Sequence, residues 1–256
     1  MSTARQVAKQ RAKQLVRRTI GEPYVGKRLK LRRLRPAMAA LDLQPRAILD
    51  AGAEDATFVY WMADRYPQAS VTAVDIDADA MRACLATRPA AYADRVSFRV
   101  SYFADLEPGS FDLVTALDVL EHIEDDTGAV ADLFRALRPG GHLLVHVPRD
   151  QWMHADGTVE VVADKDAWRI NLGHVRMGYS PQGLRELVEG AGFEVLTQDL
   201  WVRRQAVRAH SAYTRLEHPA PLRLLSLPVT DVLSVLDRRR PPAEGNTVWL
   251  VARRPE

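Results

Sequence analysis

Apolar positions follow two different periods along the middle of this 256-residue chain. Short apolar runs typical of strands occupy residues 47–49, 71–75, 96–100, 111–117 and 142–148. Before the last of these runs, apolar residues recur at the i, i+3, i+4, i+7 spacing of a helix, at Val130, Leu133, Phe134 and Leu137. Strands that alternate with helices predict an α/β fold: a parallel sheet with helices on both faces and ligands outside the carboxyl ends of its strands.

Local signals set several element boundaries. We expect Asp77 to cap a helix that runs through Thr87, and residues 138–141 (RPGG) to stop the helix before the fifth strand. Ser180 and Pro181 predict the start of a later helix, and the segment NTVWLVARR predicts a last strand.

Composition limits the class of protein. With 47% hydrophobic residues, the chain can fill one sizeable core. Cys84 is the only cysteine, so no disulfide can form within the chain, and we expect a small buried residue in a reducing compartment. No apolar run is long enough to cross a membrane, and residues 1–20 are basic without an apolar centre, so the expected location is the cytoplasm.

Charge is unevenly distributed, although the net charge is only +2. Lys plus Arg outnumber Asp plus Glu by 12 to 1 in residues 1–36, whereas the acids lead by 27 to 13 in residues 37–200. We interpret residues 1–44 as a basic helical arm on a domain of residues 45–256. Such an arm suits an anionic membrane, a phosphate-bearing substrate or RNA. Its second helix carries an apolar stripe that we expect to pack on the core, namely Leu34, Ala37, Met38 and Leu41.

Two acidic positions outline a nucleoside site. Asp50 and Gly52 follow the first strand, and a helix begins soon afterwards, which aims backbone N–H groups beyond the strand end. Asp75 ends the second strand, where a carboxylate can accept both hydroxyls of a ribose.

Five segments in the right order resemble the class I S-adenosylmethionine-dependent methyltransferases, especially the branch that includes ubiquinone-biosynthesis, small-molecule and sugar methyltransferases. They are LDAGAEDA, VTAVDID, FDLVTALDVLEHIED, LRPGGHLLVHVP and GHVRMGYSPQGLRELVEGAGFEV. The likeness covers roughly residues 45–200. It implies a Rossmann-like fold with a mostly parallel seven-stranded sheet, S-adenosylmethionine as the cofactor, and methyl transfer.

The resemblance also implies roles for single residues. Asp50 and Gly52 match the positions that hold the methionine part of the cofactor, and Asp75 matches the ribose-binding acid. The other matches are Ile76, Ser101, Tyr102 and Phe103 around the adenine, and Leu117 and Asp118 beside the methionine amino group and the substrate.

Glu54 and Ala56 depart from the family, which has glycines there, and an acid is common where Tyr102 stands. A left-handed backbone at Glu54 would cost about 1 to 2 kcal/mol. Its side chain could instead reach the cofactor's amino group. This departure keeps open a non-catalytic protein on the same fold.

Candidate catalytic groups are histidines near the predicted strand ends. A base is needed only if the acceptor loses a proton, as a hydroxyl does. His146 is preferred because it lies on the fifth strand just before Pro148, and His122 and His174 are the alternatives. A cluster of three residues resembles a divalent-metal motif of the ubiquinone branch, namely Asp118, Glu121 and His122. We favour a role for this cluster in positioning the active-site helix and expect no metal.

Substrate contacts are expected in residues 149–178 and 201–244, which do not follow the shared pattern and which we interpret as insertions at the ligand edge. The candidates are Arg149, Arg176 and Tyr179. Arg176 suits a phosphate or carboxylate of the substrate as well as it suits a salt bridge within the protein.

An amphipathic stretch in the second insertion has two interpretations. Val229, Val232, Leu233 and Leu236 predict core packing or a lid, and Arg238 to Arg240 beside them keep open a contact with an anionic membrane.

The sequence thus predicts a cytoplasmic enzyme that methylates a small molecule or glycan, more readily at oxygen than at carbon or nitrogen. The alternatives are a scaffold with a degenerate cofactor motif, and an RNA-directed methyltransferase or RNA-binding protein that uses the arm. We do not expect a DNA partner, and RNA is disfavoured because LDVLEH stands where amino-directed nucleic-acid methyltransferases have an Asn-Pro-Pro-aromatic string.

Overall fold

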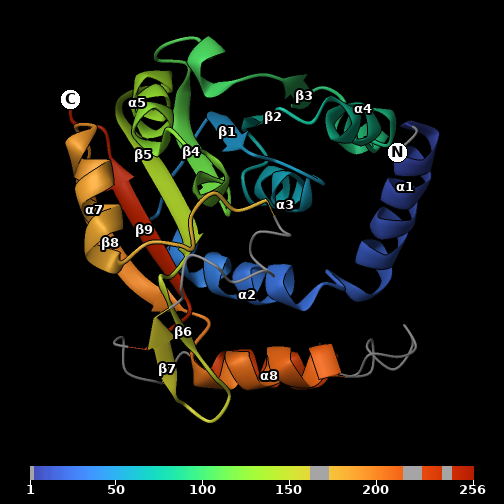
Figure 1. Ribbon diagram of the computed structural model, residues 1–256. Coiled ribbons are helices and arrows are strands. Elements are labelled where there is room, and N and C mark those ends of the chain that lie inside the picture. Colours follow the sequence, from blue (N-terminus) through green and yellow to red (C-terminus); the bar gives the residue numbers. More distant parts are fainter. Residues whose placement is uncertain (1–2, 162–172, 216–226, 238–243) are drawn as a thin grey trace.

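The computed structural model describes residues 3–161, 173–215, 227–237 and 244–256 (Figure 1). The helices are α1 (Thr3–Ile20), α2 (Val25–Ala40), α3 (Thr57–Arg65), α4 (Ala78–Ala86), α5 (Asp126–Ala136), α7 (Pro181–Gly190), α8 (Arg204–Arg215) and α10 (Leu227–Asp237), with short 3-10 turns η1 (Ala90–Tyr92), η2 (Phe103–Asp105) and η3 (Leu120–His122). The strands are β1 (Ala47–Ala51), β2 (Ser70–Asp75), β3 (Val96–Val100), β4 (Phe111–Leu117), β5 (Leu137–Pro148), β6 (Gln151–Met153), β7 (Val159–Val161), β8 (Glu194–Trp201) and β9 (Thr247–Arg253).

Seven strands form one sheet in the order β3-β2-β1-β4-β5-β9-β8. Strands β1 to β5 pair in parallel, and β9 runs antiparallel between β5 and β8. The predicted mostly parallel seven-stranded sheet is therefore confirmed. Its register places Asp50 beside Thr115 and Leu117 beside His146, so the residues at the carboxyl ends of β1, β4 and β5 share one edge.

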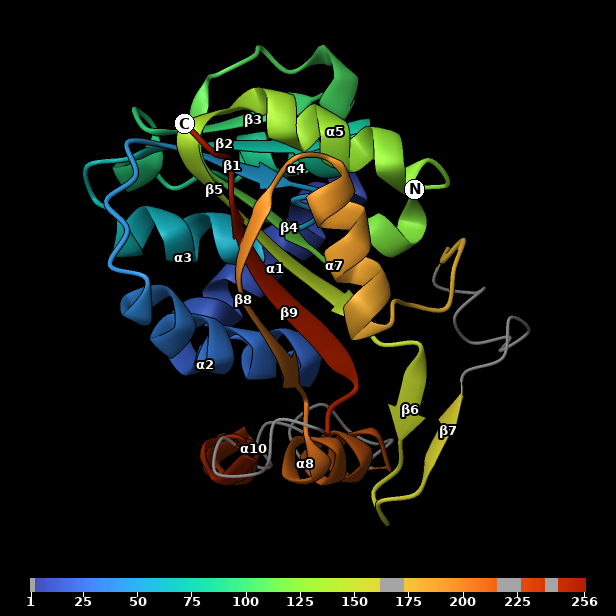
Figure 2. The same ribbon diagram turned by 90° about the vertical axis from the view of Figure 1, so that its left-hand side faces the viewer.

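Helices cover both faces of the sheet (Figure 2). On one face, α5 and α7 bury Val130, Leu133, Leu184 and Val188. On the other face, α2, α3 and α4 bury a second set: Leu34, Met38, Val59, Met62, Met81 and Cys84. The predicted caps are present as well, since Asp77 accepts hydrogen bonds from the N–H groups of Asp79 and Ala80, and Ser180 accepts one from Gly183.

The basic arm packs on the domain. Helix α1 contacts α4, while α2 contacts α8 and α10 (Figure 1). The predicted apolar stripe of α2 is confirmed, because Leu34 and Met38 are buried in the core and Ala37 and Leu41 pack against it. Both arm helices thus lie beside the carboxyl ends of the central strands.

Helix α10 differs from the core-packing interpretation of its apolar stripe, while the lid and the membrane contact stay predictions. Val229 and Val232, expected in a buried stripe, are 59% and 60% exposed. The helix buries Leu227 and Thr230 instead, because Arg28 and Arg32 of α2 both bind the Asp231 carboxylate and turn that face of α10 toward α2. The side chain of Leu236 and the residues Arg238 to Arg240 lie outside the described part.

The first insertion begins as a hairpin of β6 and β7, and its residues 162–172 lie outside the description. In the described ranges, no helix combines the length and the apolar character that a membrane crossing requires.

Candidate active site

A cavity of about 1480 Å³ opens at the carboxyl edge of the sheet. Its lining includes most of the residues predicted for the site, namely Gly52, Glu54, Asp75, Ile76, Ser101, Tyr102, Phe103, Leu117, Asp118, His122, His146 and His174. Further lining side chains come from the arm and both insertions: Lys27, Leu29, Lys30, Trp152, Val202, Val207 and His210. The arm therefore forms a wall of the cavity, which sequence analysis did not anticipate.

The turn after β1 is tight and strained. Gly52 has φ +78°, and a Cβ there would lie 2.4 Å from Val119 Cγ2, so only glycine fits. Glu54 (φ 44°) and Ala56 (φ 59°) adopt the left-handed conformation without being glycines. Each of the two residues costs the fold about 1 to 2 kcal/mol, as the sequence argument foresaw for a left-handed Glu54.

Asp50 lies beneath this turn as a buried carboxyl. Its Oδ1 accepts the Thr115 hydroxyl at 2.6 Å, and its Oδ2 has no hydrogen-bond partner within the described ranges. Burial raises the pKa of Asp50 to about 7, against the lowering effect of the Thr115 hydrogen bond. Asp50 is not among the residues that line the cavity, and its Oδ2 is a buried acceptor beneath the turn.

Asp75 is held in place for a diol. Its two oxygens accept the backbone N–H groups of Glu54 and Asp77, each at 2.9 Å, and each oxygen keeps a further lone pair for a ribose hydroxyl. Ile76 and Tyr102, at 66% and 68% exposure, present apolar surface at the same end of the cavity. Ribose and adenine of a nucleoside cofactor fit this set of residues.

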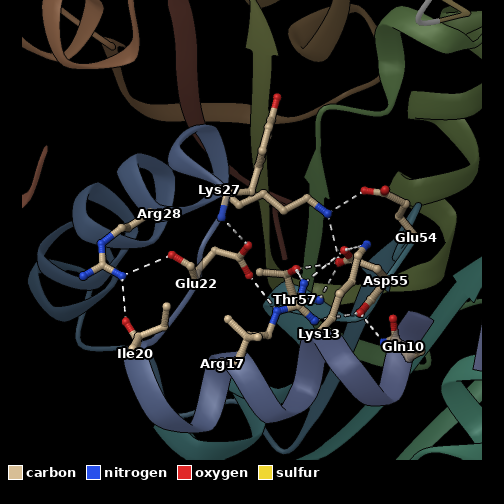
Figure 3. A network of polar contacts seen from close by, with 12 residues as sticks. Gln10, Lys13, Arg17, Ile20, Glu22, Lys27, Arg28, Glu54, Asp55 and Thr57 are labelled. Carbon is tan, nitrogen blue, oxygen red and sulfur yellow. Dashed lines mark hydrogen bonds and ion pairs between the residues drawn. The ribbon is translucent and has the colours of Figure 1, made fainter. Parts of the chain in front are cut away.

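The arm binds the strained turn through a cluster of ions (Figure 3). Asp55 accepts hydrogen bonds or ion pairs from Lys13 (2.7 Å), Arg17 (3.0 Å) and Lys27 (2.9 Å). Lys27 also binds Glu54 at 2.7 Å, so the Glu54 carboxylate is engaged by the arm. Burial alone would raise the pKa of Asp55, but the three cations outweigh it and hold that pKa well below its usual range.

On the acceptor side, the buried His146 belongs to a chain of polar contacts with Asp118 and Lys30. Its Nδ1 lies 2.6 Å from Asp118 Oδ1, and Asp118 Oδ2 binds the Lys30 ammonium group. His146 Nε2 has no hydrogen-bond partner within the described ranges. Burial and then the charge of Lys30 lower the pKa of His146 well below its usual range, so the imidazole is neutral.

Two tryptophans support this histidine. The His146 ring lies 5.7 Å from that of Trp201, which stacks on Trp249 at 4.4 Å and 13°.

Glu121, His122 and His174 form the group that could hold a metal ion. Their ligand atoms lie within 4.8 Å of one another, and the two histidine rings meet edge to face at 4.7 Å. Asp118, the first residue of the predicted motif, does not join this group, because its carboxylate is bound by Lys30 and His146.

The three candidate substrate residues lie behind the cavity wall, outside its lining. Arg176 donates to the carbonyls of Leu120, Ile123 and Glu124 and pairs with Asp126 at 3.3 Å. Tyr179 donates to Asp126 at 2.8 Å and forms a strand bridge with Arg149. These contacts favour a structural part for Arg176, the salt-bridge alternative, in fixing residues 120–124 beneath the cavity.

Sequence analysis missed Asp55, Lys27 and Lys30. The signal was present: residues 1–36 hold twelve basic residues and one acid, while the turn after β1 carries two adjacent acids. Lys27 and Lys30 are three residues apart and therefore share one face of α2.

Comparison with known proteins gives consistent matches. The family described as "Methyltransferase domain" matches residues 24–198. Trans-aconitate 2-methyltransferase of Acidovorax ebreus is 29% identical over 158 residues, which are 60% of this chain and 59% of that protein. Ubiquinone biosynthesis O-methyltransferase of Xanthomonas oryzae pv. oryzae is 33% identical over 116 residues, 44% of this chain and 47% of that protein.

The chain thus matches less than two thirds of the length of these relatives. Among solved structures, the [4+2]-cyclase SpnF superimposes with a TM-score of 0.61 at 21% identity, covering 88% of this chain and 81% of that one. This likeness concerns the fold.

Proposed function

Because this chain belongs to the methyltransferase domain family, we propose that it transfers a methyl group from S-adenosylmethionine to a hydroxyl group of a small molecule or glycan. The observation that carries the proposal is the pairing of two half-sites in one cavity: Gly52, Asp75 and the apolar Ile76–Tyr102 end on one side, and neutral His146 on the other.

The cofactor half fits by its donors and acceptors. Asp75 would hold the ribose hydroxyls, and Ile76 and Tyr102 would flank the adenine. Asp50 Oδ2 is a buried acceptor beneath the methionine end. When bound, S-adenosylmethionine supplies a methyl group on a positively charged sulfur, which leaves as a neutral thioether.

His146 would take the proton of the acceptor. A neutral imidazole whose Nδ1–H is donated to Asp118 offers the Nε2 lone pair as a base. During methyl transfer the acceptor hydroxyl would lose its proton to Nε2, and Asp118 would stabilise the imidazolium that results. His122 and His174 remain alternative bases, since they line the same cavity.

The acceptor compartment suits a ring. Leu29, Trp152, Val202 and Val207 give it apolar walls, and an indole can stack on a sugar or an aromatic face. Phenols and sugars are therefore the acceptor classes that we propose.

A non-catalytic scaffold is the second candidate, because Glu54 and Ala56 hold strained positions where glycine is usual. The RNA alternative has less support from the arm, whose Lys13, Arg17, Lys27 and Lys30 bind carboxylates of this chain.

Calorimetric titration with S-adenosylmethionine and S-adenosylhomocysteine tests the proposal, with NADH as a comparison ligand. We expect micromolar binding that Asp75→Ala abolishes and Asp79→Ala, a surface acid paired with Arg82, preserves. Absence of binding at millimolar ligand would refute the enzyme and favour the scaffold.

With cofactor binding established, phenols and nucleotide sugars are the first acceptors to screen. His146→Gln should then lower the rate of methyl transfer by about 10²-fold or more. An unchanged rate would exclude His146 as the base.

A further inference from the structure

Lys30 reaches the acceptor side of the cavity from a helix outside the sheet. It lies on α2, one turn after Lys27, and its side chain is largely buried. Lys27 binds Glu54 and Asp55 at the cofactor turn, whereas Lys30 binds Asp118 at the end of β4. One face of α2 therefore serves both halves of the site.

The backbone of Asp118 is held in an unusual conformation next to His146. It is a non-glycine residue with φ 56°, and its N–H donates to the His146 carbonyl at 2.8 Å. The two Asp118 oxygens have different partners, Oδ1 with His146 Nδ1 and Oδ2 with Lys30. Rotation of the carboxylate away from His146 would break the ion pair.

We propose that Lys30 is a positioning residue that orients Asp118 to accept the Nδ1 proton of His146, which fixes His146 in the tautomer with its lone pair on Nε2. The inference rests on the proposed function only for its catalytic consequence. The tautomer itself is a property of the chain without ligands.

Charge explains why a cation is needed at this point. A carboxylate beside a histidine favours the imidazolium form, which cannot act as a base. Lys30 neutralises Asp118 and places a positive charge near His146, and both effects favour the neutral ring. With an uncharged side chain at position 30, His146 would be the only remaining partner of the Asp118 carboxylate among these three residues, and its protonated form would be favoured.

Other titratable groups share this part of the cavity. They are Glu121 and His122 on η3, His174 from the first insertion, and His210 on α8. Glu121 interacts electrostatically with Lys30, so a neutral variant at position 30 also removes the counter-charge of Glu121.

The test is NMR of the full chain labelled with ¹⁵N in its histidines, with the His146 signals assigned through His146→Gln. In the wild type, Nδ1 should carry the proton near neutral pH. Lys30→Met and Lys30→Gln should each mix the two tautomers and raise the pKa of His146 by about one unit or more. Lys30→Arg should preserve the wild-type spectrum, since arginine can also bind a carboxylate.

Arg35→Met is the matched control, because it removes an exposed cation from the same helix and should leave His146 unchanged. Far-UV circular dichroism shows which variants keep the fold. If Lys30→Met does not fold, Lys30→Gln is the neutral variant used for the test. An unchanged His146 tautomer and pKa in a folded neutral variant would overturn the inference. Failure of cofactor binding in the wild type would overturn the proposed function and leave this result standing.

Discussion

Asp55 is the carboxylate on which the arm converges, and Asp55→Asn tests whether that convergence stabilises the fold. The side chain is nearly buried and binds Lys13, Arg17 and Lys27, of which Arg17 and Lys27 are themselves largely buried. Asparagine keeps the shape but not the charge, so it leaves the three cations without a counter-charge.

The expected loss of unfolding free energy is about 3 kcal/mol. Removal of one partner from a buried ion pair costs about 3 to 5 kcal/mol, and the lower end applies because Lys13 is partly exposed. Asp132→Asn is the matched control: it breaks a partly exposed i,i+3 pair with Arg135, which should contribute less than about 0.5 kcal/mol. Urea unfolding followed by circular dichroism measures both variants.

The pH dependence has a defined sign. The folded pKa of Asp55 lies below its unfolded value, so its contribution is complete above about pH 5 and declines as the pH falls below about 4. The free-energy difference between wild type and Asp55→Asn should therefore shrink in acid. A difference below about 1 kcal/mol at neutral pH, or one that grows in acid, would refute this reasoning.

Three further predictions concern the cofactor turn and the arm. Glu54→Gly should be about 1 kcal/mol more stable than Glu54→Ala in urea unfolding, because both lose the ion pair with the arm and only glycine relieves the left-handed strain; equal stability would contradict the strain. Gly52→Ala should destabilise the fold by about 2 kcal/mol or more and weaken calorimetric S-adenosylmethionine binding at least tenfold, since its Cβ would overlap Val119; wild-type values would show that the turn adapts. Asp231→Ala should lower the unfolding free energy by about 2 kcal/mol and speed proteolysis of α10, and resistance equal to the wild type would show that α10 is held by other contacts.

The fold was predictable because each element carries its own signal. Phe111–Leu117 is a strand over the range that its apolar run indicates, and Ser180 caps the helix that Pro181 begins. Such local rules act over a few residues, so one sequence suffices to read them. The resemblance added the strand count.

The candidate site was predictable on the cofactor side for a similar reason. Asp75 and Gly52 lie at strand ends, and parallel topology brings strand ends together. Lys30 and Asp55 were not predictable, because their contacts join α2 to segments 28 and 88 positions further along the chain. Charge asymmetry shows that the arm has cations to place, but no local pattern says which carboxylate each one finds.

The error at α10 has the same origin. Val229 and Val232 have helical spacing, and periodicity alone places apolar residues inside. Two arginines of α2 determine which face of α10 is buried by binding Asp231, and these contacts span 203 and 199 residues.

That separation has a consequence for the order in which the molecule is built. During synthesis α2 emerges early. Lys27 can pair with Glu54 as soon as the next 27 residues have been made, whereas Arg28 can pair with Asp231 only after a further 203 residues. Contacts of such long range slow folding, because the loop they close must be ordered first. Helix α2, which forms a wall of the active site, is thus among the first segments made, and its ion pairs with Asp231 are among the last that can form.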